Sequence, residues 1–273
     1  MKSMYLVIQE QIKYFYLVRR LSLYEIKSKN KNNFLGMAWE IINPLIQITI
    51  YWFVFGYGIR ERQPIEVAEG MYVPFLQWML PGIIIWFFFY QSTIEASKSI
   101  YTRLKMLSKM KFPMSVIPNI VIFAKFYTHL IMVLVTFLIL QFSGYSINIY
   151  YLQIVYFAFA TFMFIYSLAL ITSTLATFVR DVQMFLQAVL RMLLYLSPIL
   201  WTISTLPASI QIIMKINPLY YLIEGYRHAF LGLGWYFIDQ WQYTLYFWIV
   251  TVALFLIGSI LHIKFRKHFI DFI

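Results

Sequence analysis

Long uncharged stretches separate short charged ones along this chain of 273 residues. The longest runs from Phe126 to Val179 and contains no Asp, Glu, Lys or Arg. A helix that crosses the ~30 Å hydrocarbon core of a membrane needs about 20 apolar residues, so this stretch holds two spans joined by a tight turn near 141–150. The same criterion predicts six membrane spans in all, near residues 41–59, 70–94, 113–141, 150–179, 183–205 and 240–263.

The first 40 residues hold seven basic and three acidic residues and no long apolar run. They are therefore neither a cleavable signal peptide nor a first span. An apolar stripe from Ile8 to Ile26 nevertheless follows helical spacing, although Arg19 falls within it. We expect residues 1–40 to form an interfacial segment with an amphipathic helix lying in the membrane surface.

A second amphipathic segment, residues 97–111, follows the second predicted span. Its apolar residues recur every three or four positions, which predicts a short helix at the membrane surface. The apolar face of this helix holds Ile100, Leu104 and Leu107, and the opposite basic face holds Lys98, Lys105 and Lys109.

Between the fifth and sixth spans, residues 206–234 have the pattern of two short helices. Pro207 and Pro218 suit the first turn of a helix, and Gly232 suits a helix end. Each helix has about ten to fourteen residues, which is too few to cross the membrane. We expect a re-entrant hairpin that dips into the outer leaflet, returns, and leaves the topology unchanged.

The composition is that of a membrane protein, because 62% of the residues are hydrophobic and only 12% are charged. A soluble domain carries about 25% charged residues. The 22 Lys and Arg exceed the 11 Asp and Glu, for a net charge of +11. We interpret this excess as topological charge beside anionic headgroups and expect no nucleic-acid partner. The chain has no cysteine, which excludes disulfides and thiolate metal sites.

Basic residues gather in the N-terminal segment, after the second span, and in the C-terminal tail. With six spans these regions share one side, and the positive-inside rule makes that side the cytoplasm, so both termini are expected there. Arg180 and Asp181 interrupt the apolar chain between the fourth and fifth spans. They fall on the same cytoplasmic side, where charged residues in a turn are tolerated.

Residue types that perform catalysis are scarce. The sequence has no G-x-x-x-x-G-K-[ST] loop, so the chain does not bind ATP by that route. It has three aspartates, and none pairs with another at metal-ligand spacing. We therefore predict no catalytic and no metal site in this chain, and leave open whether it forms part of an enzyme.

Lys125 and His129 are four residues apart within a predicted span and share a helix face. A charge this deep in the bilayer costs at least about 2.5 kcal/mol. Two interpretations stay open. Either the Lys125 side chain extends back to the cytoplasmic headgroups, or Lys125 and His129 line a path for an anionic substrate.

The chain has 56 aromatic residues, 22 Tyr, 26 Phe and 8 Trp. The run "WFFFYQ" at 86–91 surrounds a whole helical turn, so some of its rings must face the protein interior. Aromatic faces can stack on sugar rings, whereas ordinary helix packing and interfacial belts are the commoner roles of such residues.

Five strings resemble, in order and spacing, the ABC-2 type permeases that export surface polysaccharides. The resemblance covers nearly the whole chain and is closest to the teichoic acid export permeases of Gram-positive bacteria, with O-antigen and capsule permeases next. The strings are "NNFLGMAWEIINPL" at 32–45, "KMKFP" at 109–113, "FVRDV" at 178–182, "LSPILW" at 196–201 and "NPLYYLIEGYR" at 217–227.

The resemblance implies a half-transporter in a bacterial cell membrane, in which two copies of this chain act with two copies of a separate ATPase. ATP and Mg would be bound by that ATPase, and this chain would hold no cofactor. The cargo would be a lipid-linked glycan or polyol-phosphate polymer, moved from the cytoplasmic to the outer face. Residues implied in coupling to the ATPase are Ile100, Arg103, Leu104, Lys105, Leu107, Lys109, Arg180 and Asp181.

The resemblance also implies a substrate path and an outer gate. In this family the lipid leaves sideways while the glycan follows an aromatic-lined path, and the 206–234 hairpin corresponds to the gate. The candidate path residues are Trp39, Trp86, Phe87, Tyr90, Lys125, His129 and Tyr195, and the candidate gate residues are Pro207, Pro218, Glu224, Arg227 and Gly232.

Three other functions stay open. A drug or small-lipid exporter of the same superfamily would need a compact apolar pocket. A proton-coupled carrier would use Lys125 and His129 without an ATPase, and such carriers commonly show internal repeats, which this sequence lacks. A membrane-embedded transferase or phosphatase would need a cluster of carboxylates or histidines, which the chain also lacks.

Overall fold

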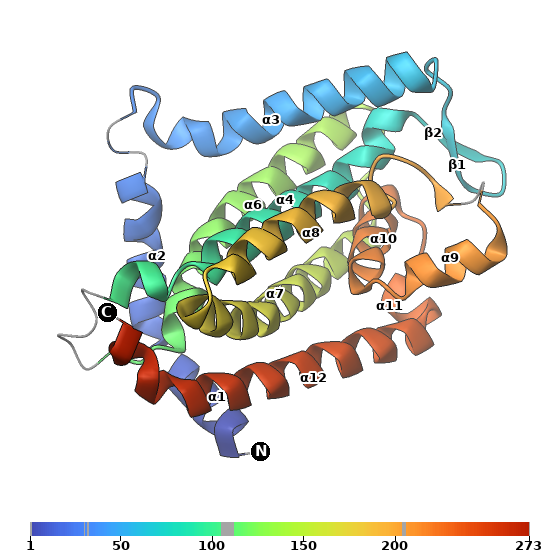
Figure 1. Cartoon of the computed structure of the whole chain (residues 1–273). Coiled ribbons are helices and arrows are strands. Elements are labelled where there is room, and N and C mark those ends of the chain that lie inside the picture. The colour runs from blue at the N-terminus through green and yellow to red at the C-terminus, as the bar shows by residue number, and fades with distance from the viewer. Residues whose placement is uncertain (1, 30, 32, 105–111, 204–205, 273) are drawn as a thin grey trace.

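The computed structural model describes residues 2–29, 31, 33–104, 112–203 and 206–272, and most of them are helical. The long helices run lengthwise between two ends of the molecule (Figure 1). They are α3 (Trp39–Tyr51), α4 (Phe75–Ser97), α6 (Val116–Phe142), α7 (Gln153–Phe178), α8 (Asp181–Leu196) and α12 (Trp241–Phe265).

Short elements cover the two ends of this bundle (Figure 1). One end carries α1 (Lys2–Lys13) and α2 (Phe15–Lys29), beside the C-terminal end of α12. The other end carries β1 (Ile65–Ala68), β2 (Met71–Val73), α9 (Ala208–Lys215), α10 (Pro218–Leu231) and α11 (Tyr236–Asp239).

Within the described residues, four helical stretches are long and apolar enough to cross a membrane, which makes this a multi-pass membrane protein. Two of the six predicted spans, at 70–94 and 183–205, are not among these four stretches. Helix α4 begins at Phe75, five residues later than predicted. Helix α8 has 16 residues, about 24 Å at a rise of ~1.5 Å per residue. The four stretches are Gly36–Ile59, Val116–Phe142, Ile149–Phe178 and Trp241–Phe269.

Helix α8 ends at Leu196, nine residues before the predicted end of the fifth span. The cause is Pro198, which has no backbone N–H and disfavours helical geometry at the residue before it. Ser197 accordingly has ψ 147°, an extended conformation. Length and composition therefore support a membrane crossing for four helical stretches, and the crossings of α4 and α8 stay predictions.

Residues 60–70, between the first two predicted spans, contain the start of a β-hairpin, a local exception in a chain whose other described elements are all helices, as its predicted helical spans imply. Strands β1 and β2 pair antiparallel, with Ile65 opposite Val73 and Glu66 opposite Tyr72. Gly70 turns the chain between the strands at φ 72°, a value that favours glycine. Ile65 and Val73 are buried, so the hairpin packs one apolar face onto the bundle.

Helix α4 forms the centre of the core, and it packs against α6, α7, α8 and α10. Its sequence is apolar around the whole circumference, and a helix of that kind is buried on all sides. The run from Ile83 to Phe89 is buried at every position. Most of the "WFFFYQ" aromatics are therefore packing residues, as the commoner interpretation of that run predicts.

Helix α10 packs so closely on α7 that position 225 has room only for glycine. A Cβ at Gly225 would lie 2.2 Å from the Phe157 ring. We expect Gly225→Ala to destabilise the fold by about 1–3 kcal/mol, because the Phe157 ring must move. Thermal unfolding in detergent checks this, with Gly58→Ala as the control, since nothing lies within 4 Å of a Cβ there. Equal unfolding temperatures for the two variants would contradict the packing.

The N-terminal segment forms α1 and α2, which dock on the bundle by a narrow face. Val7 and Val18 are buried, whereas Ile12 of the predicted apolar stripe is 73% exposed. Glu10 accepts a hydrogen bond from Arg266 at 2.8 Å and thereby ties α1 to the end of α12. The predicted stripe thus faces away from the bundle, where an interfacial helix would meet lipid.

Residues 98–103, within the segment predicted as an amphipathic helix, form turns instead of an α-helix. Helix α4 continues to Ser97, and a single 3-10 turn follows at Tyr101–Arg103. Ile100 and Leu104 are buried in a cluster with Ile117, so this part of the predicted apolar face packs within the chain. Three further residues of the prediction, Lys105, Leu107 and Lys109, lie outside the described residues.

Candidate functional site

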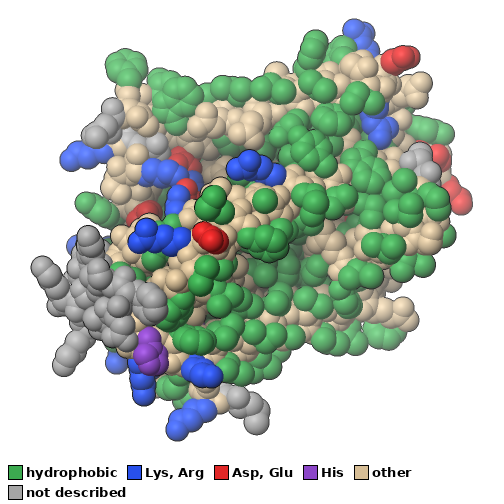
Figure 2. Space-filling model, in the orientation of Figure 1, with side chains coloured by type: hydrophobic (Ala, Val, Ile, Leu, Met, Phe, Trp, Pro, Cys, Tyr) green, Lys and Arg blue, Asp and Glu red, His purple; other side chains and the backbone are tan. Residues whose placement is uncertain are grey.

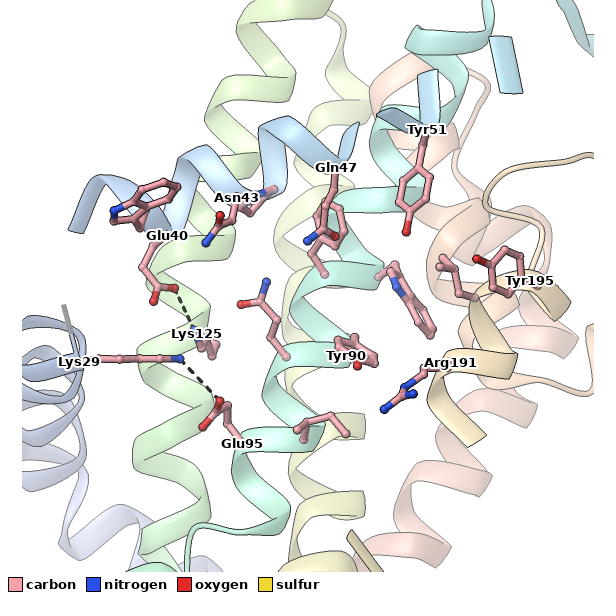
Figure 3. Close-up of a pocket in the computed structure, with 17 residues that line it drawn as sticks. Lys29, Glu40, Asn43, Gln47, Tyr51, Tyr90, Glu95, Lys125, Arg191 and Tyr195 are labelled. Atoms are coloured by element: carbon pink, nitrogen blue, oxygen red, sulfur yellow. Dashed lines mark hydrogen bonds and ion pairs between the residues drawn. The ribbon is translucent and has the colours of Figure 1, made fainter. Parts of the chain in front are cut away.

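A cavity of about 710 Å³ lies between α3, α4 and α8, with one side chain each from α2 and α6 (Figure 3). Figure 2 shows basic and acidic side chains gathered in the hollow beneath α3. The lining residues are Lys29, Trp39, Glu40, Asn43, Pro44, Gln47, Tyr51, Trp86, Phe87, Tyr90, Gln91, Ile94, Glu95, Lys125, Arg191, Leu194 and Tyr195.

Helix α3 presents a polar face to this cavity. Glu40, Asn43, Gln47 and Tyr51 are spaced by three or four residues, and they point into the cavity together (Figure 3). Elsewhere on the helix, Ile46 and Ile50 are exposed, whereas Pro44 and Ile48 are buried against the bundle. A span with a polar face toward a cavity and exposed apolar side chains elsewhere fits a helix between lipid and a hydrated path.

Aromatic rings line the wall opposite α3. Trp86 and Tyr90 lie on α4 with ring centroids 5.7 Å apart. Trp86 is buried, whereas Tyr90 and Trp39 are half-buried, and Tyr195 on α8 is exposed. Of the predicted path aromatics, Trp39, Tyr90 and Tyr195 therefore offer the most ring surface to a ligand.

Charged residues occupy the cavity at the end near α2. Lys125 donates a hydrogen bond to Glu40 at 2.9 Å, and both side chains are largely buried. Lys29 and Glu95 form a looser ion pair, 3.6 Å long, with the lysine side chain 46% exposed. Lys125 thus lines the cavity as the partner of a carboxylate on α3, and its contact with headgroups or with an anionic substrate stays a prediction.

His129 lies outside the lining of the large cavity and lines a smaller one with Lys125, so its place on the path stays a prediction. Its ring stacks on Phe88 with centroids 4.7 Å apart, and its Nε2 shares a 2.8 Å hydrogen bond with the Tyr226 hydroxyl. The structure records no hydrogen bond between His129 and Lys125.

Comparison with known proteins decides the family. The sequence model described as ABC-2 type transporter matches residues 16–231, well over half of the chain. The chain belongs to the ABC-2 type transporter family.

Curated relatives of this ABC-2 transporter match along most of their length. An O-antigen export system permease protein, RfbA, from Klebsiella pneumoniae is 26% identical over 250 residues, which covers 90% of this chain and 91% of the relative. RfbA from Myxococcus xanthus is 24% identical, covering 82% and 84%. The inner membrane transport permease YadH of Escherichia coli strain K12 is 23% identical, covering 78% and 84%.

The turn between α7 and α8 of this ABC-2 transporter contacts the segment after α4. The Arg180 guanidinium lies 5.9 Å from the centre of the Tyr101 ring, and the Tyr101 hydroxyl donates a 2.5 Å hydrogen bond to Gln183. No ion pair between Arg180 and Asp181 is recorded. Asp181 instead lies in the first turn of α8, where a negative charge is favoured by the helix dipole.

The predicted gate segment forms two helices of unequal burial. Pro207 precedes α9, Pro218 begins α10, and Gly232 ends α10 in the left-handed conformation at φ 72°. Helix α9 has no buried residue, whereas eleven residues of α10 are buried. The two predicted gate charges belong to the buried helix, and Arg227 and Glu224 pair at 2.6 Å.

Some cavity residues that were not predicted could have been found from residue type and helical spacing in the sequence. Glu40 is an acidic residue beside a span, and such residues usually have an internal partner. Asn43 and Gln47 continue its spacing along one helical face. Lys29 and Arg191 carry no such signal, because their place in the cavity depends on how α2 and α8 pack.

Proposed function

We propose that this ABC-2 transporter is the permease subunit of an ATP-driven exporter of a lipid-linked surface polysaccharide. The cavity between α3, α4 and α8 carries the proposal. It combines half-buried aromatic rings with two amides and a tyrosine hydroxyl on one face of α3. The apolar face of a sugar ring can stack on the aromatic rings, and its hydroxyl groups can form hydrogen bonds with the amides and the tyrosine hydroxyl.

The energetics favour a protein-lined path. A long hydrophilic polymer does not partition into hydrocarbon, because its hydroxyl groups would lose their hydrogen bonds to water. A drug or small-lipid exporter would instead need an apolar pocket, and charged and amide side chains line this cavity. The energy for transport would come from a separate ATPase that binds ATP and Mg, since the sequence lacks a phosphate-binding loop.

The assembly that we propose contains two copies of this chain and two of the ATPase. Helices α4 and α8 would cross the membrane beside the four stretches that are long and apolar enough to span it. This gives six crossings and places both termini in the cytoplasm. Helices α9 and α10 would form the outer gate. The Arg180 turn and its Tyr101 contact would face the ATPase.

An O-antigen type glycan is the cargo that we favour, which reverses the order expected from the sequence resemblance. The RfbA relatives are named O-antigen export permeases and match nearly the full chain. A teichoic acid, a polyol-phosphate polymer, is the second candidate. The specific observation in its favour is the exposed Arg191 in the cavity wall, where a backbone phosphate could bind.

The proposal predicts the behaviour of two aromatic variants. Trp39→Ala and Tyr90→Ala should each reduce glycan-stimulated ATP hydrolysis several-fold, because each removes ring surface worth about 0.5–1.5 kcal/mol. The measurement uses the permease with its ATPase in vesicles, with and without lipid-linked glycan. Phe53→Ala is the matched control, since Phe53 lies in Trp52–Ile59, the helical continuation of α3, but is 65% exposed outside the cavity.

Two results would contradict the proposed function. The first is a wild-type complex whose ATP hydrolysis does not respond to lipid-linked glycan. The second is equal loss of stimulation in Phe53→Ala and in the two cavity variants, because the effect would then not arise from the cavity.

A further inference from the structure

The charges around the cavity do not cancel. Lys125 and Glu40 neutralise one another at 2.9 Å. Glu95 is shared by two lysines, Lys29 at 3.6 Å and Lys98 at 3.2 Å, which leaves one positive charge in excess. Arg191 adds another positive charge, because no ion pair with it is found among the described residues. Three cationic and two acidic side chains line the cavity, so the lining carries one uncompensated positive charge, and Lys98 adds a second from outside the lining.

The two lysines that line the cavity differ in how firmly they are held. The Lys125–Glu40 pair is largely buried within a span, and separating it would leave a charge uncompensated in a dry environment. The Lys29–Glu95 pair is long and part-exposed, and such pairs contribute little stability. Lys29 can therefore exchange its carboxylate for a ligand at little cost, whereas Lys125 remains the partner of Glu40.

Lys29 and Arg191 approach the cavity from opposite sides. Lys29 extends from α2 toward Glu95, and the Arg191 guanidinium points inward from α8 toward Tyr90 (Figure 3). A guanidinium forms two parallel hydrogen bonds with a phosphate, and an ammonium adds a compact charge. Arg191 lies beside Tyr90, whereas Lys29 lies across the cavity on the α2 side (Figure 3), so an anion beside the aromatic rings would meet Arg191 directly and Lys29 only through its charge.

We propose that Arg191 binds a phosphate group of the cargo, while Lys29 adds positive charge from the opposite side of the cavity. This proposal rests on the proposed function, because a lipid-linked polymer carries its phosphate where the apolar chain meets the glycan. The same chemistry occurs in two places, in the phosphate that links lipid to glycan and in the repeated phosphates of a polyol-phosphate polymer. The ring surfaces of Trp39 and Tyr90 would then receive the first sugars.

Direct binding to the purified full-length chain in lipid nanodiscs tests this site without transport. The probes are farnesyl diphosphate, farnesol and a short oligo(glycerol phosphate). We expect Arg191→Gln to weaken binding of farnesyl diphosphate about tenfold or more, since a charge-assisted bidentate contact is lost. Lys29→Gln should weaken it less, and Arg191→Lys should restore part of the affinity. Farnesol binding should be the same in all variants.

Arg180→Gln is the matched control, because it removes the same charge from the other end of α8, outside the cavity. Binding of farnesyl diphosphate alone would assign the site to the lipid linkage, and binding of the glycerol phosphate oligomer alone to the polymer backbone. Unchanged affinity in Arg191→Gln, or an equal loss in Arg180→Gln, would overturn the site.

Failure of the phosphate site and failure of the proposed function give different results. If deleting the gene for this chain leaves surface polysaccharide unchanged, the exporter function is wrong, whatever the nanodiscs bind. If the deletion abolishes surface polysaccharide while Arg191→Gln binds farnesyl diphosphate like the wild type, only the phosphate site is wrong.

Discussion

Lys125→Met is expected to lower the free energy of unfolding by about 3–5 kcal/mol, because it leaves the Glu40 carboxylate buried without its cation. The two groups are 2.9 Å apart and only 10% and 15% exposed. The contact joins residues that are 85 positions apart, and it is the polar tie between α3 and α6. Unfolding of the purified chain in mixed detergent micelles measures the change.

A double variant separates the stability lost with the ion pair from the stability lost by leaving one buried charge without a partner. Lys125→Met with Glu40→Gln removes both charges, so this double variant should be more stable than Lys125→Met alone. Lys98→Met is the control, because its pair with Glu95 is about one-third exposed at each partner and should be worth under about 1 kcal/mol. A double variant no more stable than the single one would show that the pair does not hold α3 in place.

Arg227→Ala is expected to be the most damaging single substitution at the end of the bundle that carries α9 and α10, with a loss of about 3–5 kcal/mol of unfolding free energy. The guanidinium is 2% exposed and joins three parts of the chain. It donates to Glu224 on its own helix, to the Pro198 carbonyl at 2.5 Å, and to the Trp78 carbonyl at 3.3 Å. Without it, α10 loses its tie to α4 and to the chain after α8.

The geometry of Arg227 also predicts that lysine cannot replace it. The guanidinium lies 3.5 Å from the centre of the Trp78 ring, and a planar fork can stack there while reaching several acceptors at once. Arg227→Lys should therefore recover little of the stability lost in Arg227→Ala. Arg62→Ala is the control, since Arg62 also lies over a ring, at 4.5 Å from Tyr57, but is exposed. An unfolding temperature for Arg227→Ala equal to that of Arg62→Ala would contradict this account.

The helices were predictable from the sequence where apolar periodicity and length agree. Helices α7 and α12 largely coincide with long uncharged stretches, and α6 does so apart from Lys125, because a helix in hydrocarbon must be mostly apolar along its length. The end of α8 was missed although Pro198 stood in the sequence, since the uncharged stretch continues past it. The strands β1 and β2 were missed because a three- or four-residue strand carries too little alternation to detect.

Six residues named as path candidates from the sequence, five aromatics and Lys125, line one cavity, since they lie on helices that pack around it. Its other charged residues were not predicted, and they are Lys29, Glu40, Glu95 and Arg191. His129 lies outside this lining, because sharing a helix face with Lys125 does not fix how far each side chain reaches.

The partner of Lys125 was not readable from spacing, since Glu40 lies on a different helix. The same holds for the Trp78 and Pro198 carbonyls that accept hydrogen bonds from Arg227. The Arg227 pair with Glu224 was readable, because the two residues are three apart on one helix.

The central claim is that the cavity beneath α3 holds the polymer during export. The chain has no cysteine, so single cysteines can be placed at Gln47→Cys, inside the cavity, and at Ile50→Cys, on the exposed face of the same helix. The measurement is the labelling rate with a membrane-permeant maleimide, in vesicles with the ATPase, with and without lipid-linked glycan. We predict that the glycan protects Gln47→Cys and leaves Ile50→Cys unchanged. Unaltered labelling of Gln47→Cys in a complex that still exports glycan would contradict the account.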